Sequence, residues 1–242
     1  MINNKGKVYI VGAGPGDPEL ISLKGLKALR KADCVLYDFL SPSELLNYTK
    51  PHSEEICVGK SDGLHLKEQR SINRLLYRKA LEYKRVVRLK GGDPYIFSRG
   101  AEEARYLSNR KINYEVIPGI TSAIAGPESV GIPLTIKNEL SSVAILTGRK
   151  KNPRAKIDVP NCDTLIYLMA VANIAKVVKA LIKKGKSINT PCAFIERATR
   201  KDSRVIRSTI SKIVEKAKKY RLRPPAVLIV GKVVDNIILG PE

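Results

Sequence analysis

The sequence has no tryptophan, three phenylalanines and two histidines, and aromatic residues make up only 5% of its 242 residues. So few histidines argue against a His-based metal cluster, and no metal is expected. The aromatic residues are too sparse, and too far from the basic runs, to form a stacking surface for nucleic-acid bases. The sequence also lacks an apolar run near the ~20 residues of a membrane-spanning helix. We therefore expect no membrane contact.

Cysteine is equally scarce, with four residues that lie far apart and form no C-x-x-C pair. Strand-like patterns around Cys34, Cys57 and Cys192 favour buried thiols over a disulfide framework or a zinc site. The N-terminal segment, Met1 to Lys7, is polar and does not resemble a signal peptide. Together these features predict a reducing, cytoplasmic setting.

Acidic residues are few relative to basic ones, with 23 Asp+Glu against 44 Lys+Arg and a net charge of +21. The excess is uneven, because residues 1–120 carry a net +7 and residues 121–242 a net +14. Such a charge indicates nucleic acid, an anionic membrane surface or a polyanionic small molecule as partner. A basic nucleic-acid-binding protein remains an alternative, although no helix-turn-helix, zinc-finger or RNA-recognition signature is found.

Strand-like and helix-like patterns alternate along the chain, and 43% of the residues are hydrophobic, enough for a substantial core. In the first half, strands are expected at Lys7–Val11, Cys34–Tyr37, Glu55–Val58, Arg85–Leu89 and Tyr114–Ile117, and helices from Asp17 to Lys31, near Ser43–Tyr48, and over Lys67–Leu81 and Ala101–Leu107. In the second half, strands are expected at Ser142–Leu146, Thr164–Leu168, Cys192–Ile195 and Ala226–Val230, helices at Ile174–Lys184 and Ile210–Lys219, and one strand of an antiparallel pair at Arg204–Ser208.

This alternation predicts an α/β fold with mostly parallel sheets. Pro118-Gly119 follows about five strand units and is the expected junction of two α/β domains, residues 1–118 and 119–242.

Three glycine-containing loops follow expected strands. The loop from Gly12 to Asp17 resembles a dinucleotide fingerprint, but Asp17 stands where a third glycine is required, which argues against NAD(P). The others are Gly91-Gly92-Asp93-Pro94 and Pro118-Gly119-Ile120-Thr121-Ser122-Ala123. Ligands of open α/β sheets bind beyond the carboxyl ends of strands, so the three loops could face one crevice. Each loop taken alone fits a plain turn equally well.

Taken together and in order, these stretches resemble the tetrapyrrole (corrin/porphyrin) methylase family over essentially the whole chain. The matching stretches are VYIVGAGPGDPELISLKG (8–25), ADCVLYDFL (32–40), VGK (58–60), VVRLKGGDPYIFSRGAEE (86–103), YEVIPGITSAIAGPESVGIPLT (114–135), TLIYLMAVANI (164–174), CAFIERATRKDSRVIRSTI (192–210) and PPAVLIVGKVV (224–234).

The resemblance implies two α/β/α domains, an active site in the cleft between them, and a homodimer. It also implies S-adenosyl-L-methionine as cofactor, with S-adenosyl-L-homocysteine as its product. Within the family, these motifs are most similar to those of members that methylate uroporphyrinogen III at C-2 and C-7, giving precorrin-2 for sirohaem and cobalamin synthesis. A methyltransferase acting on a later precorrin remains an alternative within the family.

The resemblance also carries residue roles onto matching positions. The cofactor-binding positions are Pro15, Gly91, Gly92, Asp93, Ile96, Thr121, Ser122, Met169, Ala198, Pro225 and Ala226. Ser122 replaces a family alanine and Ala198 a family glycine. Asp38 matches a proton acceptor and Lys60 a proton donor, and Arg99 joins these as a third catalytic candidate.

Glu102 and Lys137 match positions that contact substrate. Lys137 keeps the charge of the family's frequent arginine but not its planar fork, and Phe39 departs from a usual arginine. Other readings of the catalytic candidates stay open. Asp38 could cap a turn, Lys60 could bind a substrate carboxylate, and Arg99 could form a surface ion pair with Glu102 or Glu103.

Overall fold

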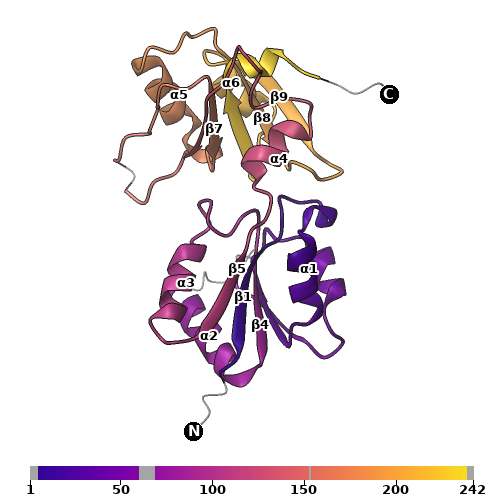
Figure 1. Ribbon diagram of the computed structural model, residues 1–242. Coiled ribbons are helices and arrows are strands. Elements are labelled where there is room, and N and C mark those ends of the chain that lie inside the picture. The colour runs from indigo at the N-terminus through magenta and orange to yellow at the C-terminus, as the bar shows by residue number, and fades with distance from the viewer. Residues whose placement is uncertain (1–4, 60–68, 153, 239–242) are drawn as a thin grey trace. The chain divides into compact units, whose positions relative to one another are not determined.

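The computed structural model describes residues 5–59, 69–152 and 154–238. The chain forms two compact units, Met1–Thr121 and Ser122–Glu242. Each unit contains one five-stranded sheet with helices on both faces (Figure 1). The structure thus divides the chain after Thr121, whereas the sequence pattern placed the junction at Pro118-Gly119.

The first unit is built on a fully parallel sheet with strand order β3-β2-β4-β1-β5. Its strands are β1 (Lys7–Gly12), β2 (Cys34–Tyr37), β3 (Glu54–Cys57), β4 (Arg85–Lys90) and β5 (Asn113–Ile117). Its helices are α1 (Leu23–Arg30), α2 (Gln69–Glu82) and α3 (Gly100–Ser108), with short 3-10 helices η1 (Pro18–Leu20) and η2 (Ser43–Tyr48). Because all strands are parallel, their carboxyl ends meet at one edge.

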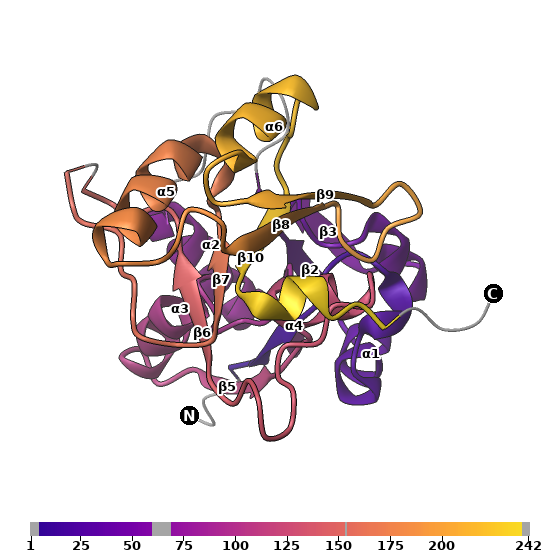
Figure 2. The same ribbon diagram turned by 90° about the horizontal axis from the view of Figure 1, so that it is seen from above.

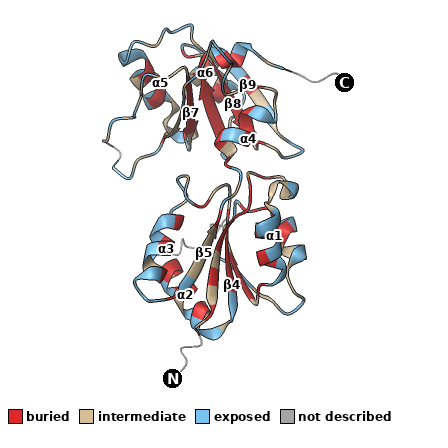
Figure 3. Ribbon diagram, in the orientation of Figure 1, coloured by how far each residue is buried: buried red, intermediate tan, exposed pale blue. Residues whose placement is uncertain are grey.

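Both faces of the central strands β2, β4 and β1 are largely buried (Figure 3). Val8 and Ile10 of β1 pack with α2 and α3, while Val11 packs with α1 on the opposite face (Figure 1). Burial on both faces explains why the strands read as continuous apolar runs rather than as alternating patterns.

The expected helix from Asp17 to Lys31 is wrong in one respect, because it is interrupted. Asp17 accepts a hydrogen bond from the Glu19 backbone N at 2.9 Å, but the 3-10 helix that it caps ends at Leu20. Ser22 is extended, and its Oγ accepts from the Gly25 N at 3.1 Å. Serine at this position caps a new helix, which begins at Leu23.

The second unit has strand order β6-β7-β10-β8-β9. Its strands are β6 (Val143–Thr147), β7 (Thr164–Leu168), β8 (Pro191–Glu196), β9 (Arg204–Thr209) and β10 (Ala226–Val230). Its helices are α4 (Ser122–Glu128), α5 (Ile174–Lys183) and α6 (Ile213–Lys219), with short 3-10 helices η3 (Val171–Asn173) and η4 (Lys232–Asp235). Helices α5 and α6 lie side by side on one face of the sheet, and α4 and η4 cover the other (Figure 2).

The expectation of mostly parallel strands is wrong for this second sheet. Only β6 and β7 pair in parallel, because β10 inserts between β7 and β8 antiparallel to both, and β9 is antiparallel to β8. The predicted antiparallel pairing of the strand near Arg204 is confirmed. The connection from β8 to β9 spans only residues 197–203, which is too short for the crossover that a parallel pair needs.

Candidate active site

The three glycine loops of the first unit pack backbone against backbone at the carboxyl edge of the sheet. A Cβ on Gly12 would lie 2.5 Å from the Gly119 Cα and 2.7 Å from the Gly92 O. Gly14 and Gly92 also exchange backbone hydrogen bonds, with N···O distances of 3.3 and 2.7 Å. The glycines at 12 and 119 are therefore needed for contact between loops, because no side chain fits between them.

Gly92 differs from these two glycines, because a Cβ built there would meet nothing closer than the Thr121 Cα at 4.0 Å. Its φ of +69° lies in the left-handed region that favours glycine. Open space beside an exposed stretch of backbone is what a ligand needs in order to approach the main chain. Gly91 precedes it in the same loop, Pro15 follows its hydrogen-bonded partner Gly14 in the neighbouring loop, and both are half-buried.

Asp93 joins two of the loops. Its Oδ1 accepts hydrogen bonds from the backbone N of Tyr95 at 2.8 Å and of Ile96 at 3.2 Å. Its Oδ2 accepts from the Gly119 N at 3.2 Å. The carboxylate thus holds the loop after β4 against the loop after β5 and fixes the turn that contains Ile96.

Asp38 follows β2 directly, at the same edge. Its backbone N donates to the Leu89 O at 3.1 Å, and its Oδ1 lies 2.5 Å from the Arg88 Nη2. The side chain is 27% exposed, so a ligand can reach the carboxylate while a buried guanidinium fixes its orientation. The structure does not support the alternative in which the Asp38 side chain caps a turn. The Ser41 N donates to the backbone O of Asp38 and not to its carboxylate.

Behind Asp38 lies a buried charge network that the sequence analysis missed. Arg88 Nε contacts Glu103 Oε1 at 3.0 Å, and Lys90 Nζ lies 3.3 Å from that atom. Lys90 Nζ also lies 3.6 Å from Asp38 Oδ2. Gln69 of α2 donates to Glu103 Oε1 at 3.1 Å.

The network perturbs both of its cations. Burial acts to lower the pKa of Arg88, but the charges of Glu103 and Asp38 outweigh it and the pKa is raised. Burial, followed by the positive charge of Arg88, lowers the pKa of Lys90 despite its two carboxylate neighbours. A signal for this network does exist in the sequence. Arg88 and Lys90 alternate on one face of a strand that must be buried, and such charges require acidic partners.

Arg99 forms the surface ion pair that the sequence analysis kept open. Its Nη2 lies 2.7 Å from Glu102 Oε2 and its Nε donates to Oε1 at 3.0 Å, with both side chains 55% exposed. This hydrogen-bonded partner raises the pKa of Arg99. The alternative pairing of Arg99 with Glu103 is not seen, because Glu103 faces inward to Arg88 and Lys90.

Two further positions from the sequence analysis bear on the site. Lys60, the expected proton donor, lies outside the described residues. Phe39, which replaces the family's usual arginine, is 61% exposed directly after Asp38. An aromatic surface thus stands where a cationic contact to a substrate carboxylate was expected.

In the second unit, the candidate residues gather at one edge of the sheet. Met169 follows β7 and Ala198 follows β8, while Pro225 precedes β10 and Ala226 is its first residue. Because β10 is antiparallel to both neighbours, its amino end lies beside their carboxyl ends, with Val227 opposite Leu168 and Ala226 opposite Glu196.

Backbone strain marks the same edge. Three non-glycine residues there have positive φ, namely Met169 at 56°, Arg197 at 48° and Thr199 at 65°. The Arg197 N donates to the Pro225 O at 2.9 Å, which ties the loop after β8 to the segment before β10. Left-handed conformations at non-glycine residues are costly and concentrate at functional sites.

Three candidates remain outside these strand ends. Thr121 ends the first unit and is buried, and Ser122 begins α4 in the second. Lys137 is exposed in a turn closed by the Ile136 N donating to the Leu140 O at 2.9 Å.

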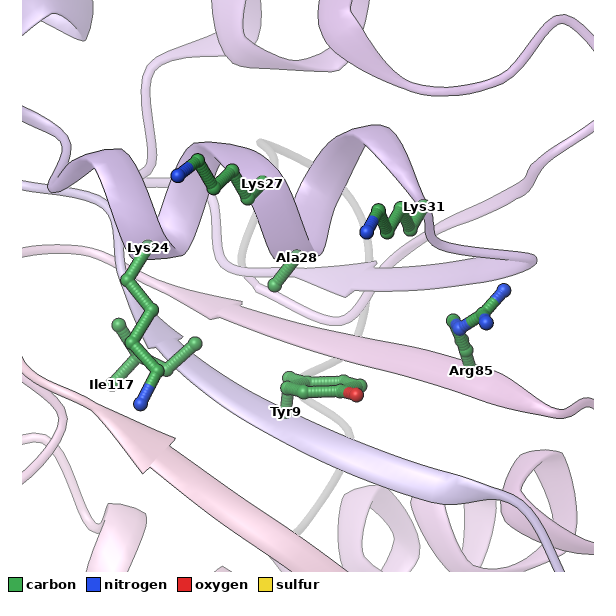
Figure 4. Close-up of a pocket in the computed structure, with 7 residues that line it drawn as sticks. All are labelled: Tyr9, Lys24, Lys27, Ala28, Lys31, Arg85 and Ile117. Atoms are coloured by element: carbon green, nitrogen blue, oxygen red, sulfur yellow. The ribbon is translucent and has the colours of Figure 1, made fainter.

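A separate basic pocket lies in the first unit between α1 and the sheet (Figure 4). It has a volume of about 170 Å³ and is lined by Tyr9, Lys24, Lys27, Ala28, Lys31, Arg85 and Ile117. Lys24 also pairs with Glu115. None of the predicted site residues lines this pocket. In the first unit the predicted residues lie instead at the carboxyl edge of the sheet, with the glycine loops and Asp38, and we place the candidate site there.

The described residues include no group of three or more His, Cys, Asp or Glu side chains placed to hold a metal ion. In the same part of the chain, no helix is long and apolar enough to cross a membrane. Cys34 and Cys192 are buried free thiols as expected, but the expectation is wrong for Cys57, which is exposed on edge strand β3.

Comparison with known proteins gives a consistent assignment. The sequence profile of the tetrapyrrole (corrin/porphyrin) methylases matches residues 7–214. A protein of Methanocaldococcus jannaschii named uroporphyrinogen-III C-methyltransferase is 52% identical over 235 residues, covering 95% of this chain and 97% of that protein.

Two solved structures are similar to this one throughout their length. The uroporphyrin-III C-methyltransferase of Thermus thermophilus, crystallised with S-adenosyl homocysteine, is 36% identical with a TM-score of 0.81, covering 96% of this chain and 100% of that one. A cobalt precorrin-4 methyltransferase is 30% identical, also with a TM-score of 0.81, covering 95% of this chain and 96% of that one.

Proposed function

Because the chain belongs to the tetrapyrrole (corrin/porphyrin) methylase family, we propose that it is a uroporphyrinogen-III C-methyltransferase. It transfers methyl groups from S-adenosyl-L-methionine to C-2 and C-7 of uroporphyrinogen III, giving precorrin-2. The 52% identity to the Methanocaldococcus jannaschii enzyme, across nearly the full length of both chains, supports this substrate. Precorrin-2 would feed sirohaem or cobalamin synthesis.

One structural observation carries the chemical part of the proposal. Asp38 presents a partly exposed carboxylate, fixed by Arg88, at the edge where the glycine loops converge. A positioned carboxylate can take up the proton that the macrocycle releases after methylation. This is the role of a general base, and in the described part of the first unit no other predicted catalytic residue is held in this way.

The residues present fit the cofactor. The open space beside the Gly92 backbone admits a ligand, since an added Cβ would contact nothing nearer than 4.0 Å. In the first unit we assign Pro15, Gly91, Gly92, Asp93, Ile96 and Thr121 to cofactor binding. In the second unit we assign Ser122, Met169, Ala198, Pro225 and Ala226. When bound, S-adenosyl-L-methionine supplies a sulfonium methyl group that needs alignment with the attacking carbon rather than further activation.

The chain's own residues then have two tasks. The loops hold the donor and the ring so that the ring carbon attacks the methyl carbon in line while the S–CH₃ bond breaks. The electron pair of that bond remains on sulfur, and the ring becomes cationic. Asp38 next takes a proton from the ring, which returns the ring to its neutral state. Methyl transfer and proton removal then repeat at the second carbon.

Substrate charge fits the composition of the chain. Uroporphyrinogen carries a carboxylate on every peripheral side chain, so a positive potential on the protein favours its approach. We propose Lys60, Arg99 and Lys137 as contacts to these carboxylates, with Lys60 also a candidate proton donor. We also propose Glu102, the ion-pair partner of Arg99, as a substrate-contact residue.

A later precorrin is the second candidate substrate, because the cobalt precorrin-4 methyltransferase reaches the same TM-score of 0.81. A homodimer is also proposed, from the family resemblance alone.

In the test of the proposed function, the enzyme is incubated with S-adenosyl-L-methionine and enzymatically generated uroporphyrinogen III, and the absorbance and mass of the product are recorded. Appearance of a dimethylated isobacteriochlorin-like product supports the proposal. No methylation of this substrate, together with turnover of a later precorrin, supports the second candidate.

A further inference from the structure

The basic pocket beside α1 has an apolar floor. Tyr9 of β1, Ala28 of α1 and Ile117 of β5 belong to one hydrophobic cluster on this face of the sheet (Figure 4). Ala28 and Ile117 are 9% and 2% exposed, and Tyr9 is half-buried. Because the floor displaces water, an ionic contact made inside the pocket is stronger than one in open solvent.

Cationic side chains from two elements surround this floor. Lys24 and Lys27 lie in α1, Lys31 follows its last residue, and Arg85 begins β4. Lys27 and Lys31 are about one helical turn apart, and like charges with this spacing destabilise a helix. The pocket thus concentrates positive charge at a cost that a bound anion would remove.

Two carboxylates contact residues of the lining, but each is paired with a lysine. Glu115 pairs with Lys24. Asp33 accepts a hydrogen bond from the Arg85 backbone N at 2.9 Å through Oδ2, and its Oδ1 pairs with Lys50 at 2.5 Å. These carboxylates therefore compensate only part of the positive charge around the pocket.

Three cations of the lining have no carboxylate partner. Within residues 5–59, 69–152 and 154–238, Lys27, Lys31 and the Arg85 guanidinium form no ion pair. The dipole of α1 favours lysine near the end of the helix, which explains Lys27 and Lys31 in part. It does not explain Arg85, which reaches the same pocket from a strand.

The size of the pocket limits what can bind. Its volume is about 170 Å³. An apolar cavity of ~150 Å³ accepts benzene, whereas pockets for drug-sized ligands measure roughly 300–1,000 Å³. The pocket therefore has room for one ring-sized group, but not for a nucleotide or a tetrapyrrole macrocycle.

We propose that this pocket binds a small organic molecule, about the size of a substituted benzene ring, that carries at least two negative charges. The apolar part of the molecule lies on the Tyr9 ring, and its acidic groups contact Lys27, Lys31 and Arg85. Carboxylates and phosphates both pair with lysine and arginine, so both meet this description. The site is separate from the proposed methyl-transfer site and does not depend on it.

Three probes with the same ring test the requirement for charge. Isophthalate carries two carboxylates, phenyl phosphate has a charge of about −2 near pH 8, and benzoate has a single carboxylate. Each is titrated in ~0.1 M salt into the full chain labelled with ¹³C at the isoleucine δ1 methyl groups. The Ile117 methyl resonance, identified by its loss in Ile117→Val, reports on the pocket floor.

At least one of the two dianions should shift the Ile117 resonance to saturation, with a Kd of about 1 mM or lower. Benzoate should bind at least roughly fivefold more weakly, because it pairs with fewer of the cations. The dianion that binds more tightly identifies the acidic group, carboxylate or phosphate, that the pocket prefers.

Substitutions in the lining test whether binding occurs in the pocket. Lys31→Gln and Arg85→Gln each remove one unpaired cation and should raise the Kd of the tighter dianion roughly fivefold. Ala28→Leu fills the floor without changing the charge and should abolish saturation. The matched control is Lys179→Gln, which removes an exposed lysine of α5 in the second unit and should leave the Kd unchanged.

The Ile182 methyl group is the reference for nonspecific attraction. Ile182 is 43% exposed on α5, beside the exposed Lys183. A dianion attracted only by the general basic surface would shift the Ile182 and Ile117 resonances in parallel. Specific binding instead predicts saturation at Ile117 and a small, linear change at Ile182.

Parallel shifts of the two resonances, or no saturation with either dianion, would overturn the proposal. So would benzoate binding as tightly as the dianions, or a Kd that is unchanged in Lys31→Gln and Arg85→Gln. If Ala28→Leu does not fold, these two charge variants decide. Because no step of the test requires methyl transfer, failure to methylate uroporphyrinogen III would refute the proposed function and leave this test intact.

Discussion

Gly12 shows most directly how one residue holds the first unit's loops together. A methyl group there would lie 2.5 Å from two backbone atoms of Gly119, and neither loop can retreat without breaking its own contacts. Gly12→Ala should lower the free energy of unfolding by about 3 kcal/mol and weaken the binding of S-adenosyl-L-homocysteine. Urea unfolding and calorimetric titration measure the two effects.

The matched control for Gly12→Ala is Gly126→Ala. The nearest neighbours of an added Cβ at Gly126 are the Cβ of Ala198 and a Val227 methyl, both at an ordinary 3.5 Å. Since this glycine lies in helix α4, alanine should be tolerated and even stabilise it by ~0.5–1 kcal/mol. Equal losses of stability in the two variants would contradict the close approach of the loops.

The free thiols differ in reactivity according to burial. Burial raises the pKa of Cys34 to about 12, and also raises that of Cys192 to about 12. Cys57 is exposed. A maleimide should therefore label Cys57 quickly in the native protein, and Cys34 and Cys192 only after unfolding, as read by peptide mass. Rapid labelling of Cys34 or Cys192 in the native Cys57→Ser variant would contradict the burial of these two thiols.

At this scale, the sequence was informative about residues that lie in distinctive loops. Asp38, Gly92 and Asp93 were selected as candidates because their neighbours form recognisable motifs after strands. Glu103 was read only as a possible partner of Arg99, because spacing along a helix says nothing about which side chain faces a buried arginine. Its contact with Arg88 depends on the packing of α3 against β4, which no local pattern encodes.

At the scale of elements, Asp163 joins the starts of two strands in the second unit. Its Oδ2 accepts hydrogen bonds from the Ser142 Oγ at 2.7 Å, the Ser141 N at 2.9 Å and the Ser142 N at 3.0 Å. These bonds, led by that of the Ser142 side chain, lower the pKa of Asp163. A carboxyl whose pKa is lower when folded stabilises the protein above its unfolded pKa of ~4, and this stabilisation is lost as pH falls.

Asp163→Asn should therefore lower the free energy of unfolding at pH 7 and flatten its decline between roughly pH 5 and pH 2. Urea unfolding at several pH values measures both effects. Asp202→Asn is the control, since it removes a surface ion pair with Arg197 in which Asp202 is 59% exposed. An acid decline as steep in Asp163→Asn as in the control would contradict the assigned hydrogen bonds.

Element positions followed from the sequence more readily than strand directions. The strands at Thr164–Leu168 and Ala226–Val230 were predicted to the residue, because both are short apolar runs, and the second is bounded by Pro225 and Gly231. The direction of β10 was not foreseen, since a fully buried strand has the same apolar pattern whether its neighbours are parallel or antiparallel. Its insertion between β7 and β8 depends on pairing between segments far apart in the sequence.

At the scale of the whole molecule, the net charge of +21 has only a partial explanation. Lys90 and Arg88 are buried and balanced, and many basic residues of the second unit, such as Lys218 and Lys219, lie on exposed helix faces. A polyanionic small molecule accounts for attraction to the candidate site without a nucleic acid. Retention on a nucleic-acid column should accordingly vanish by ~0.2 M salt, because nonspecific electrostatic contacts weaken steeply there.

The central claim is that this chain places methyl groups on C-2 and C-7 of uroporphyrinogen III. The most direct measurement is ¹³C NMR of the product formed with S-adenosyl-L-methionine labelled in its methyl group. We predict two labelled methyl resonances, both on quaternary ring carbons that are assigned to C-2 and C-7 by their couplings. Label at other ring carbons, or none in the macrocycle while a later precorrin becomes labelled, would contradict the account.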